Sequence, residues 1–251
     1  MRYRAKKRDD SKVRERLKEL ASERRRFGSP RLTVMLRREG FTDNHKRIER
    51  IYAEEGLQVR RRKRKRTCRS QRVRKVTDVV RPNQRWSMDF VHDMVANGRR
   101  IRCLTIIDDF TRECPHIEVA HSIGGDRVGR VLDFLAWSRG LPEEIVVDNG
   151  PEFTSLALDK WAHANGVALH FIEPGKPTQN CFIESFNGSF RDECFNDHWF
   201  INLSDAQRKV ETWRVDYNKV RPHSSLDDLA PEEFAEKNGM MRENLSLDVA
   251  Q

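Results

Sequence analysis

An unbroken run of seven basic residues divides this sequence and limits how it can fold. Residues 60–66 are all Arg or Lys, and four more basic residues follow by position 75. Like charges at this density repel one another and have no place in an apolar core. We therefore predict a basic linker at residues 60–80, folded segments at residues 1–59 and 81–236, and a tail at residues 237–251.

The excess of positive charge extends to the whole chain and predicts a polyanionic partner. There are 48 Lys plus Arg against 39 Asp plus Glu, a formal net charge of +9, which favours nucleic acid. An acidic membrane surface would attract the run as well, but no apolar stretch near ~18 residues accompanies it. We expect double-stranded DNA as the partner and no membrane, with linker contacts to phosphates through Arg61, Arg62, Lys63 and Arg64.

Five scattered cysteines form no CxxC pair, and the first residues lack the apolar stretch of a secretory signal. We expect reduced thiols and a cytoplasmic location. A zinc site at Cys181, Cys194 and His198 is an alternative, but a fourth ligand at a suitable spacing is missing.

The first segment has the periodicity of three helices. Residues 12–25 and a second stretch ending before Gly40 each carry one apolar stripe, with Ser29 as the expected N-cap of the second helix. Thr42 or Asp43 is the expected cap of a third helix. Two short helices joined by a tight turn, the second with a basic outer face at Arg47 and Arg50, are typical of a helix-turn-helix unit that contacts DNA. A three-helix bundle with a solvated charged face is the alternative, and the adjoining basic run favours DNA binding.

From about residue 81 the pattern changes to short apolar runs separated by turn residues. Residues 86–95, 100–107, 116–120, 144–148 and 167–172 are predicted strands. The first two form a hairpin across Asn97-Gly98, a strong hairpin signal. Residues 126–138, 156–165 and 179–195 are predicted helices. This order predicts an α/β segment of ribonuclease H-like type, with a five-stranded mixed sheet flanked by helices.

Three carboxylates stand out in this order of elements. Asp89 lies in an apolar strand, where an ionised side chain is costly without a cation or partner, and Asp148 ends another apolar strand. In the last predicted helix Phe182, Phe186 and Phe190 form an expected buried seam, and Glu184 falls on a different side with Asn187 and Arg191. We expect the three carboxylates to meet at one edge of the sheet.

The sequences around these residues resemble a known family. They are WSMDF at 86–90, VDNGPEF at 147–153 and PGKPTQNCFIESFNG at 174–188, with 35 residues between Asp148 and Glu184, followed by WRVDYN at 213–218 and RPHSSL at 221–226. The chain resembles bacterial insertion-sequence transposases with a retroviral-integrase-like catalytic core, and within them the second-frame product of two-frame elements. The resemblance covers nearly the whole chain.

The resemblance implies a DNA transposase that cleaves the ends of its element and transfers the strands into new DNA. Asp89, Asp148 and Glu184 would be the catalytic ligands of two Mg²⁺ ions, with Mn²⁺ as a substitute. It also implies a first-frame protein or fusion partner and a homo-oligomer on DNA. A DNA-binding regulator and an RNA–DNA hybrid nuclease are alternatives, which the intact carboxylates and the helix-turn-helix unit respectively disfavour.

Further residues around the carboxylates have predicted roles of lesser weight. Position in the motif and on the helix predicts contacts to DNA phosphates and bases, although capping and solvation of the helix is the alternative. The residues are Lys176, Gln179, Asn180, Asn187 and Arg191, with Arg221 and His223 in a later basic cluster. Asp108 and Asp109 end the second strand and are weaker metal-ligand candidates. Asp93 is expected at the rim, and Glu193 is expected to be solvated.

Overall fold

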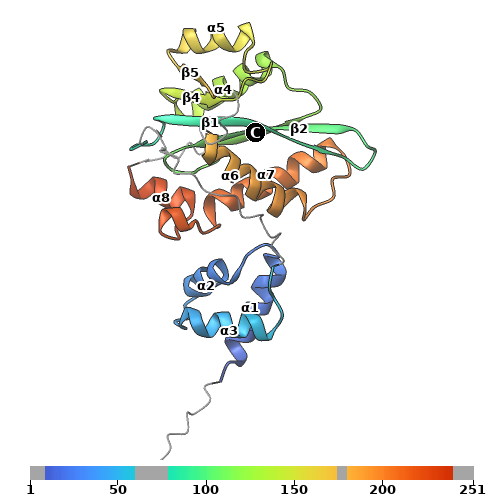
Figure 1. Ribbon diagram of the computed structural model, residues 1–251, viewed down its shortest axis with the longest axis vertical. Coiled ribbons are helices and arrows are strands. Elements are labelled where there is room, and N and C mark those ends of the chain that lie inside the picture. Colours follow the sequence, from blue (N-terminus) through green and yellow to red (C-terminus); the bar gives the residue numbers. More distant parts are fainter. Residues whose placement is uncertain (1–8, 60–78, 174–179, 240–251) are drawn as a thin grey trace, which may run out of the picture. The chain divides into compact units, whose positions relative to one another are not determined.

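The computed structural model describes residues 9–59, 79–173 and 180–239. The chain divides into two compact units, residues 1–73 and 74–251, and each is described by itself (Figure 1). None of the helices within the described residues is long and apolar enough to cross a bilayer.

The first unit consists of three helices, α1 (Ser11–Glu23), α2 (Ser29–Arg38) and α3 (His45–Glu54). One apolar stripe from each helix meets the others, with Leu17, Leu32 and Ile48 fully buried. The expected N-caps of α2 and α3 were wrong by one or two residues. Gly28 is the N-cap of α2 and Ser29 is already helical, whereas the Asn44 side chain caps α3 by accepting a hydrogen bond from Lys46 N at 3.1 Å.

A five-stranded mixed sheet forms the centre of the second unit, as predicted. Its strands are β1 (Arg85–Met94), β2 (Arg100–Asp108), β3 (His116–Ala120), β4 (Glu144–Val147) and β5 (Ala168–Phe171), in the order β3-β2-β1-β4-β5. The first three strands pair antiparallel, and β4 and β5 run parallel to β1. Gly98 turns the β1–β2 hairpin with φ +79°, a conformation that glycine adopts without strain.

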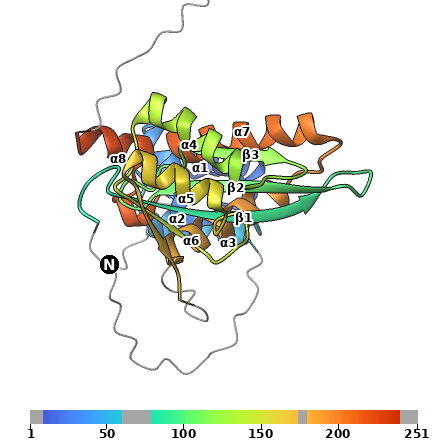
Figure 2. The same ribbon diagram turned by 90° about the horizontal axis from the view of Figure 1, so that it is seen from above.

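Helices cover both faces of this sheet (Figures 1 and 2). On one face α4 (Gly125–Arg139) and α5 (Leu156–Asn165) pack over Trp86, Met88 and Leu104. On the other face α6 (Cys181–Phe190) and α7 (Leu203–Lys219) pack over Val91 and Cys103. A short turn, η3 (Ser224–Leu226), and α8 (Pro231–Lys237) follow. Alternate residues of β1 therefore belong to two separate apolar cores.

The helix predicted at residues 179–195 differs from the observed one in two respects. It ends at Phe190 and continues as a π-helical turn, η2 (Arg191–Phe195). The buried apolar residues of α6 are Ile183, Phe186 and Phe190, whereas Phe182 is only half-buried. Residues four apart advance by about 40° around a helix axis, so a seam of every fourth residue drifts off the buried face.

One glycine permits the close approach of α4 to the N-terminus of α5. A methyl group at position 125 would overlap Ser155 Oγ, with Ser155 Cβ at 2.8 Å and Glu152 O at 3.2 Å. Ser155 caps α5 by accepting from Leu158 N. We expect Gly125→Ala to lower the free energy of unfolding by about 1–3 kcal/mol, because the cap must shift.

Chemical denaturation of the two variants Gly125→Ala and Gly129→Ala checks this expectation. A Cβ at position 129 would meet Trp161 at an ordinary 3.6 Å, so this change in the same helix should leave stability equal or higher. Equal behaviour of the two variants would contradict the packing argument.

Candidate active site

Two of the three predicted carboxylates are placed side by side by parallel strands. Ser87 pairs with Val146 between β1 and β4, and continuing this register by two residues brings Asp89 level with Asp148. Asp148 follows the last residue of β4, and its Oδ1 accepts a hydrogen bond from Gly150 N at 2.9 Å. Both side chains are half-buried. The local backbone thus fixes the orientation of Asp148 at the carboxyl end of its strand.

The third carboxylate, Glu184, lies exposed in the first turn of α6. Burial raises the pKa of Asp89 above its usual range, and the negative charges of Asp148 and Glu184 raise it further. Hydrogen bonds from Phe90 N and Asn187 act in the opposite direction. Asp89 is therefore close enough to both other carboxylates to be repelled by their charges. A cation near Asp89 would relieve this repulsion.

As the side chains stand, their convergence is incomplete. Within residues 9–59, 79–173 and 180–239, no three His, Cys, Asp or Glu side chains form a group that could hold a metal ion. The backbone brings the three carboxylates to one end of the sheet, and the exposed Glu184 retains rotational freedom.

Asn187 holds Asp89 in place, a role that the sequence did not indicate. Its Nδ2 donates to Asp89 Oδ2 at 2.8 Å, and its Oδ1 accepts from Thr105 Oγ1 at 2.9 Å. Thr105 Oγ1 also lies 3.1 Å from the Asp89 carbonyl. Asn187 is only 7% exposed. The predicted outward position of Asn187 was therefore wrong, because its amide faces the polar Thr105 on β2.

The other DNA-contact predictions on this helix have different outcomes. Asn180 is 4% exposed, and its Nδ2 faces the Met88 carbonyl at 3.5 Å, so it points into the protein rather than toward a ligand outside. Arg191 is exposed on η2 and remains a predicted DNA contact. Lys176 and Gln179 lie outside the described residues.

Asp108 and Asp109 have partners within the protein. Asp108 accepts from the backbone N–H groups of Asn83 at 2.8 Å and Phe110 at 2.8 Å, which fixes the turn after β2. Asp109 is paired with Arg85 at 2.5 Å and accepts from Ser87 Oγ at 2.7 Å. These bonds account for both buried carboxylates without a metal ion.

The predicted DNA contacts Arg221 and His223 are buried. Arg221 is 3% exposed and donates through Nε and Nη2 to both carboxylate oxygens of Glu193 at 2.7 Å. His223 Nε2 lies 3.2 Å from Arg221 Nη1. Glu193, expected to be solvated, has a side chain that is only 9% exposed. In this structure these residues join η2 to the segment after α7 instead of facing outward.

In the first unit, the predicted DNA contacts on α3 are engaged by acidic residues. Arg47 is paired with Asp10 and Asp43, and Arg50 with Asp10 and Glu54. The linker residues Arg61, Arg62, Lys63 and Arg64 lie outside the described residues.

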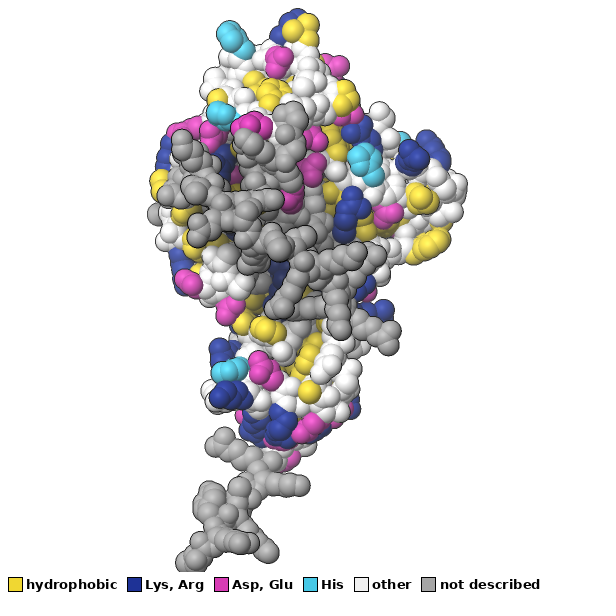
Figure 3. All heavy atoms as spheres, viewed as in Figure 1, with side chains coloured by type: hydrophobic (Ala, Val, Ile, Leu, Met, Phe, Trp, Pro, Cys, Tyr) yellow, Lys and Arg dark blue, Asp and Glu magenta, His cyan; other side chains and the backbone are white. Residues whose placement is uncertain are grey.

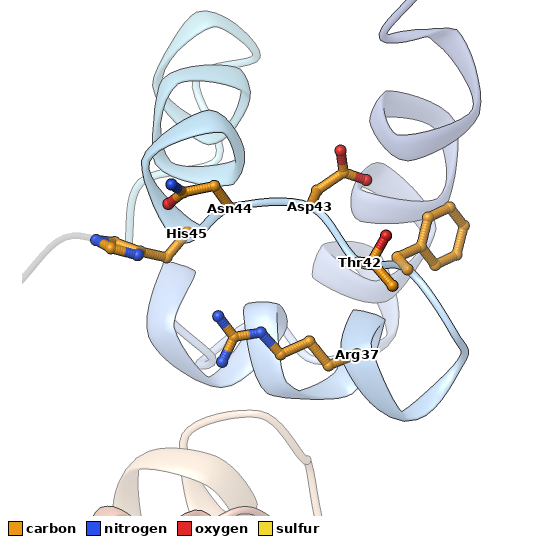
Figure 4. Close-up of a pocket in the computed structure, with 6 residues that line it drawn as sticks. Arg37, Thr42, Asp43, Asn44 and His45 are labelled. Carbon is orange, nitrogen blue, oxygen red and sulfur yellow. The ribbon is translucent and has the colours of Figure 1, made fainter.

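A hollow lies at the turn between α2 and α3 (Figure 4). Its lining residues are Arg37, Phe41, Thr42, Asp43, Asn44 and His45. Arg37 forms no ion pair with another described residue. It lines the hollow together with Asn44 and His45, which form the N-terminus of α3. Arg37 is a cation at this helix pair that sequence periodicity did not single out.

Three family models match this chain. An HTH-like domain matches residues 7–65, and two models of an integrase core domain match residues 79–177 and 165–231. Together they cover both structural units, and the sequence interpretation of a helix-turn-helix unit followed by an integrase core is confirmed.

Individual proteins give the same result. The chain is 55% identical over 223 residues to "Insertion element IS407 uncharacterized 31.7 kDa protein" of Burkholderia multivorans, covering 89% of this chain and 80% of that protein. It is 25% identical to "Transposase InsF for insertion sequence IS3A" of Escherichia coli, over 86% and 78% of the two chains. Its fold is similar to that of the HTLV-2 integrase catalytic core domain in complex with magnesium, with TM-score 0.50 and 15% identity over 62% of this chain and 98% of that one.

Proposed function

This chain belongs to the insertion-sequence transposases with an integrase core domain, and on that premise we propose that it cleaves the DNA ends of its element and joins them to new DNA. Asp89, Asp148 and Glu184 are the catalytic residues in this proposal. The observation that carries it is the parallel register of β1 and β4, which brings Asp89 level with Asp148, with Glu184 close enough for its charge to raise the pKa of Asp89. The three carboxylates come from β1, the end of β4 and the first turn of α6, respectively.

The donor set suits divalent metal ions. Mg²⁺ and Mn²⁺ prefer carboxylate oxygens as ligands. Each of the three carboxylates has lone pairs that are not used by the hydrogen bonds described above. Two such ions would activate the attacking oxygen and stabilise the leaving 3′-oxygen. Asp89, Asp148 and Glu184 would hold them, and rotation of Glu184 toward the strands would complete the set.

The protein's own groups supply orientation. Asn187 and Phe90 N hold the two oxygens of Asp89 in one rotamer, and Gly150 N holds Asp148. Fixed ligands lose little conformational entropy when the substrate phosphate arrives. Arg191 is exposed on the helical segment that follows Glu184, where we expect it to contact a phosphate of the bound end. The basic linker would contribute further phosphate contacts, and a first-frame partner and a second copy of the chain would assemble the ends.

The decisive experiment is an end-cleavage and strand-transfer assay on a labelled duplex carrying the terminus of the element. Reactions run with Mg²⁺ and with a chelator, each with and without the first-frame protein. Metal-dependent 3′-end cleavage followed by joined products supports the proposal. Binding without either product under all four conditions would refute it and favour a regulator that occupies the ends.

We expect Asn187→Ala to weaken this activity without unfolding the protein. Removing a hydrogen bond that orients a metal-binding carboxylate commonly lowers metal affinity or activity by roughly 10–100-fold. The Mg²⁺ concentration needed for the half-maximal rate should therefore rise, because the free Asp89 side chain samples other rotamers. A Mg²⁺ titration of the cleavage rate measures this change.

Ser185→Ala is the matched control, since Ser185 is exposed on the same helix two residues away. Its Mg²⁺ requirement should equal that of the wild type. An Asn187→Ala variant with an unchanged Mg²⁺ requirement and a lower melting temperature would show that the amide is only structural.

A further inference from the structure

The β1–β2 hairpin projects beyond the predicted catalytic carboxylates. Since Asp89 is level with Asp148, residues 90–94 of β1 extend past the end of β4. At about 3.4 Å per residue this overhang measures roughly 17 Å. The hairpin reaches beyond the neighbouring elements of its unit in both views (Figures 1 and 2). The overhang begins at Phe90, next to Asp89, so it lies within reach of a duplex that has a phosphate at Asp89 and Asp148.

One face of this projection carries cations. His92 lies opposite Arg102, and Met94 lies opposite Arg100, so these four side chains share a face. Arg102 is paired with Glu152 and lies over the Phe90 ring at 4.3 Å. Arg100 and the neighbouring Arg99 are exposed. Neither forms an ion pair with another residue that the structure describes.

The positive charge around His92 exceeds what its acidic neighbour offsets. Partial desolvation lowers the pKa of His92, and the charges of Arg102, Arg191 and Arg100 lower it further, while Glu152 acts in the opposite direction. Space-filling Figure 3 shows Lys or Arg side chains and a His at the projecting end. Such a surface attracts phosphates strongly.

The projection is held rigidly at its tip. Ala96 N donates to Phe200 O at 2.8 Å, and Val95 N donates to Arg99 O at 3.0 Å. Phe200 is 3% exposed and packs edge-on against Phe195, with ring centroids 5.6 Å apart. The cations therefore sit on a preorganised support, which lowers the entropic cost of binding.

We propose that the projecting hairpin is a DNA-backbone binding surface, with His92 and Arg100 on one face of the hairpin and Arg99 at its turn contacting phosphates next to the catalytic carboxylates. The proposal rests on the proposed function, because it takes the DNA substrate from there. It assigns a binding role to residues outside the carboxylate motifs and outside the helix-turn-helix unit.

The test measures how the affinity for DNA depends on salt. The full chain and its Arg99→Ala/Arg100→Ala variant bind a short fluorescent duplex of arbitrary sequence at a series of salt concentrations. The slope of log K against log salt is negative, and each lost phosphate contact reduces its magnitude by about 0.9. We expect the magnitude of the slope to fall by about 2 in the double variant, and the variant to bind more weakly at low salt.

The control is Arg130→Ala/Lys160→Ala, which removes equal charge from exposed positions on α4 and α5. Its slope should stay within about 0.5 of the wild type if binding is local to the hairpin. Equal loss in both variants would show a diffuse charge effect and overturn the proposal, as would an unchanged slope in the hairpin variant. Cleavage assays on the same proteins separate the two ideas: a changed slope with no cleavage by wild type would reject the proposed function and keep the hairpin surface.

Discussion

Replacing Glu184 with Gln is expected to abolish end cleavage and strand transfer while DNA binding persists. The amide keeps the volume of the side chain but removes the negative charge that a divalent cation requires. Metal-assisted stabilisation of the transition state amounts to several kcal/mol, so the rate should fall by roughly a thousandfold or more. Because Glu184 is exposed on α6, the fold should not change.

Single-turnover cleavage with Mg²⁺ measures the rate, and fluorescence anisotropy on the same duplex measures binding. Glu236→Gln is the matched control, because it removes one exposed carboxylate from α8 and should leave both quantities unaltered. Normal strand transfer by Glu184→Gln would exclude this residue from the catalytic set. Loss of both binding and circular dichroism would instead indicate a structural role.

The elements of the second unit were predictable because their signals are local. Asn97-Gly98 between two apolar alternating runs specifies a hairpin, and that hairpin is present with the expected strands on either side. The positions of Asp89 and Asp148 also follow locally, since each is tied to an apolar strand whose end is marked by turn residues. Their adjacency then requires only the parallel pairing of β1 with β4.

The roles of Asn187, Arg221 and Glu193 were not predictable, because their partners lie far away in the sequence. Asn187 is buried because Thr105 and Asp89 offer it hydrogen bonds, and these residues precede it by more than eighty positions. Periodicity predicts which residues share a helix face, but it does not predict which polar group of another element packs against that face. The sequence also did not predict the change to π-helical geometry at Arg191–Phe195. This change rotates the later residues relative to their positions in a continuous α-helix.

The charges of the first unit show the same limit. Sequence placed Arg47 and Arg50 on an outer face, and their acidic partners include Asp10, which precedes α1. A helical projection of one segment cannot include an acid from another. A prediction of a DNA interface should therefore include only those cations that form no ion pair within the protein. Among the described residues, Arg37 beside the α2–α3 turn is such a cation.

Replacing Arg221 with Ala should destabilise the second unit by about 3–5 kcal/mol, the usual cost of leaving a buried charge without its partner. Glu193 would lose two hydrogen bonds at 2.7 Å, and Ser189 Oγ would lose its donor at 3.1 Å. For a unit of this size the melting temperature should fall by roughly 6–20 °C. A thermal melt followed by circular dichroism measures it.

Two comparison variants separate a buried ion pair from a DNA contact. Arg208→Ala removes an arginine whose side chain is 71% exposed in its pair with Asp205, and it should cost at most about 1 kcal/mol. The double variant Arg221→Met/Glu193→Leu removes both charges and should recover most of the lost stability, because no buried charge then remains unpaired. If Arg221 instead contacted DNA, Arg221→Ala would weaken binding at an unchanged melting temperature.

The same pair should also affect cleavage, since Glu193 follows the helix that carries Glu184. Loss of the Arg221–Glu193 pair should reduce cleavage at temperatures below the melting temperature, and the double variant should restore cleavage in parallel with stability.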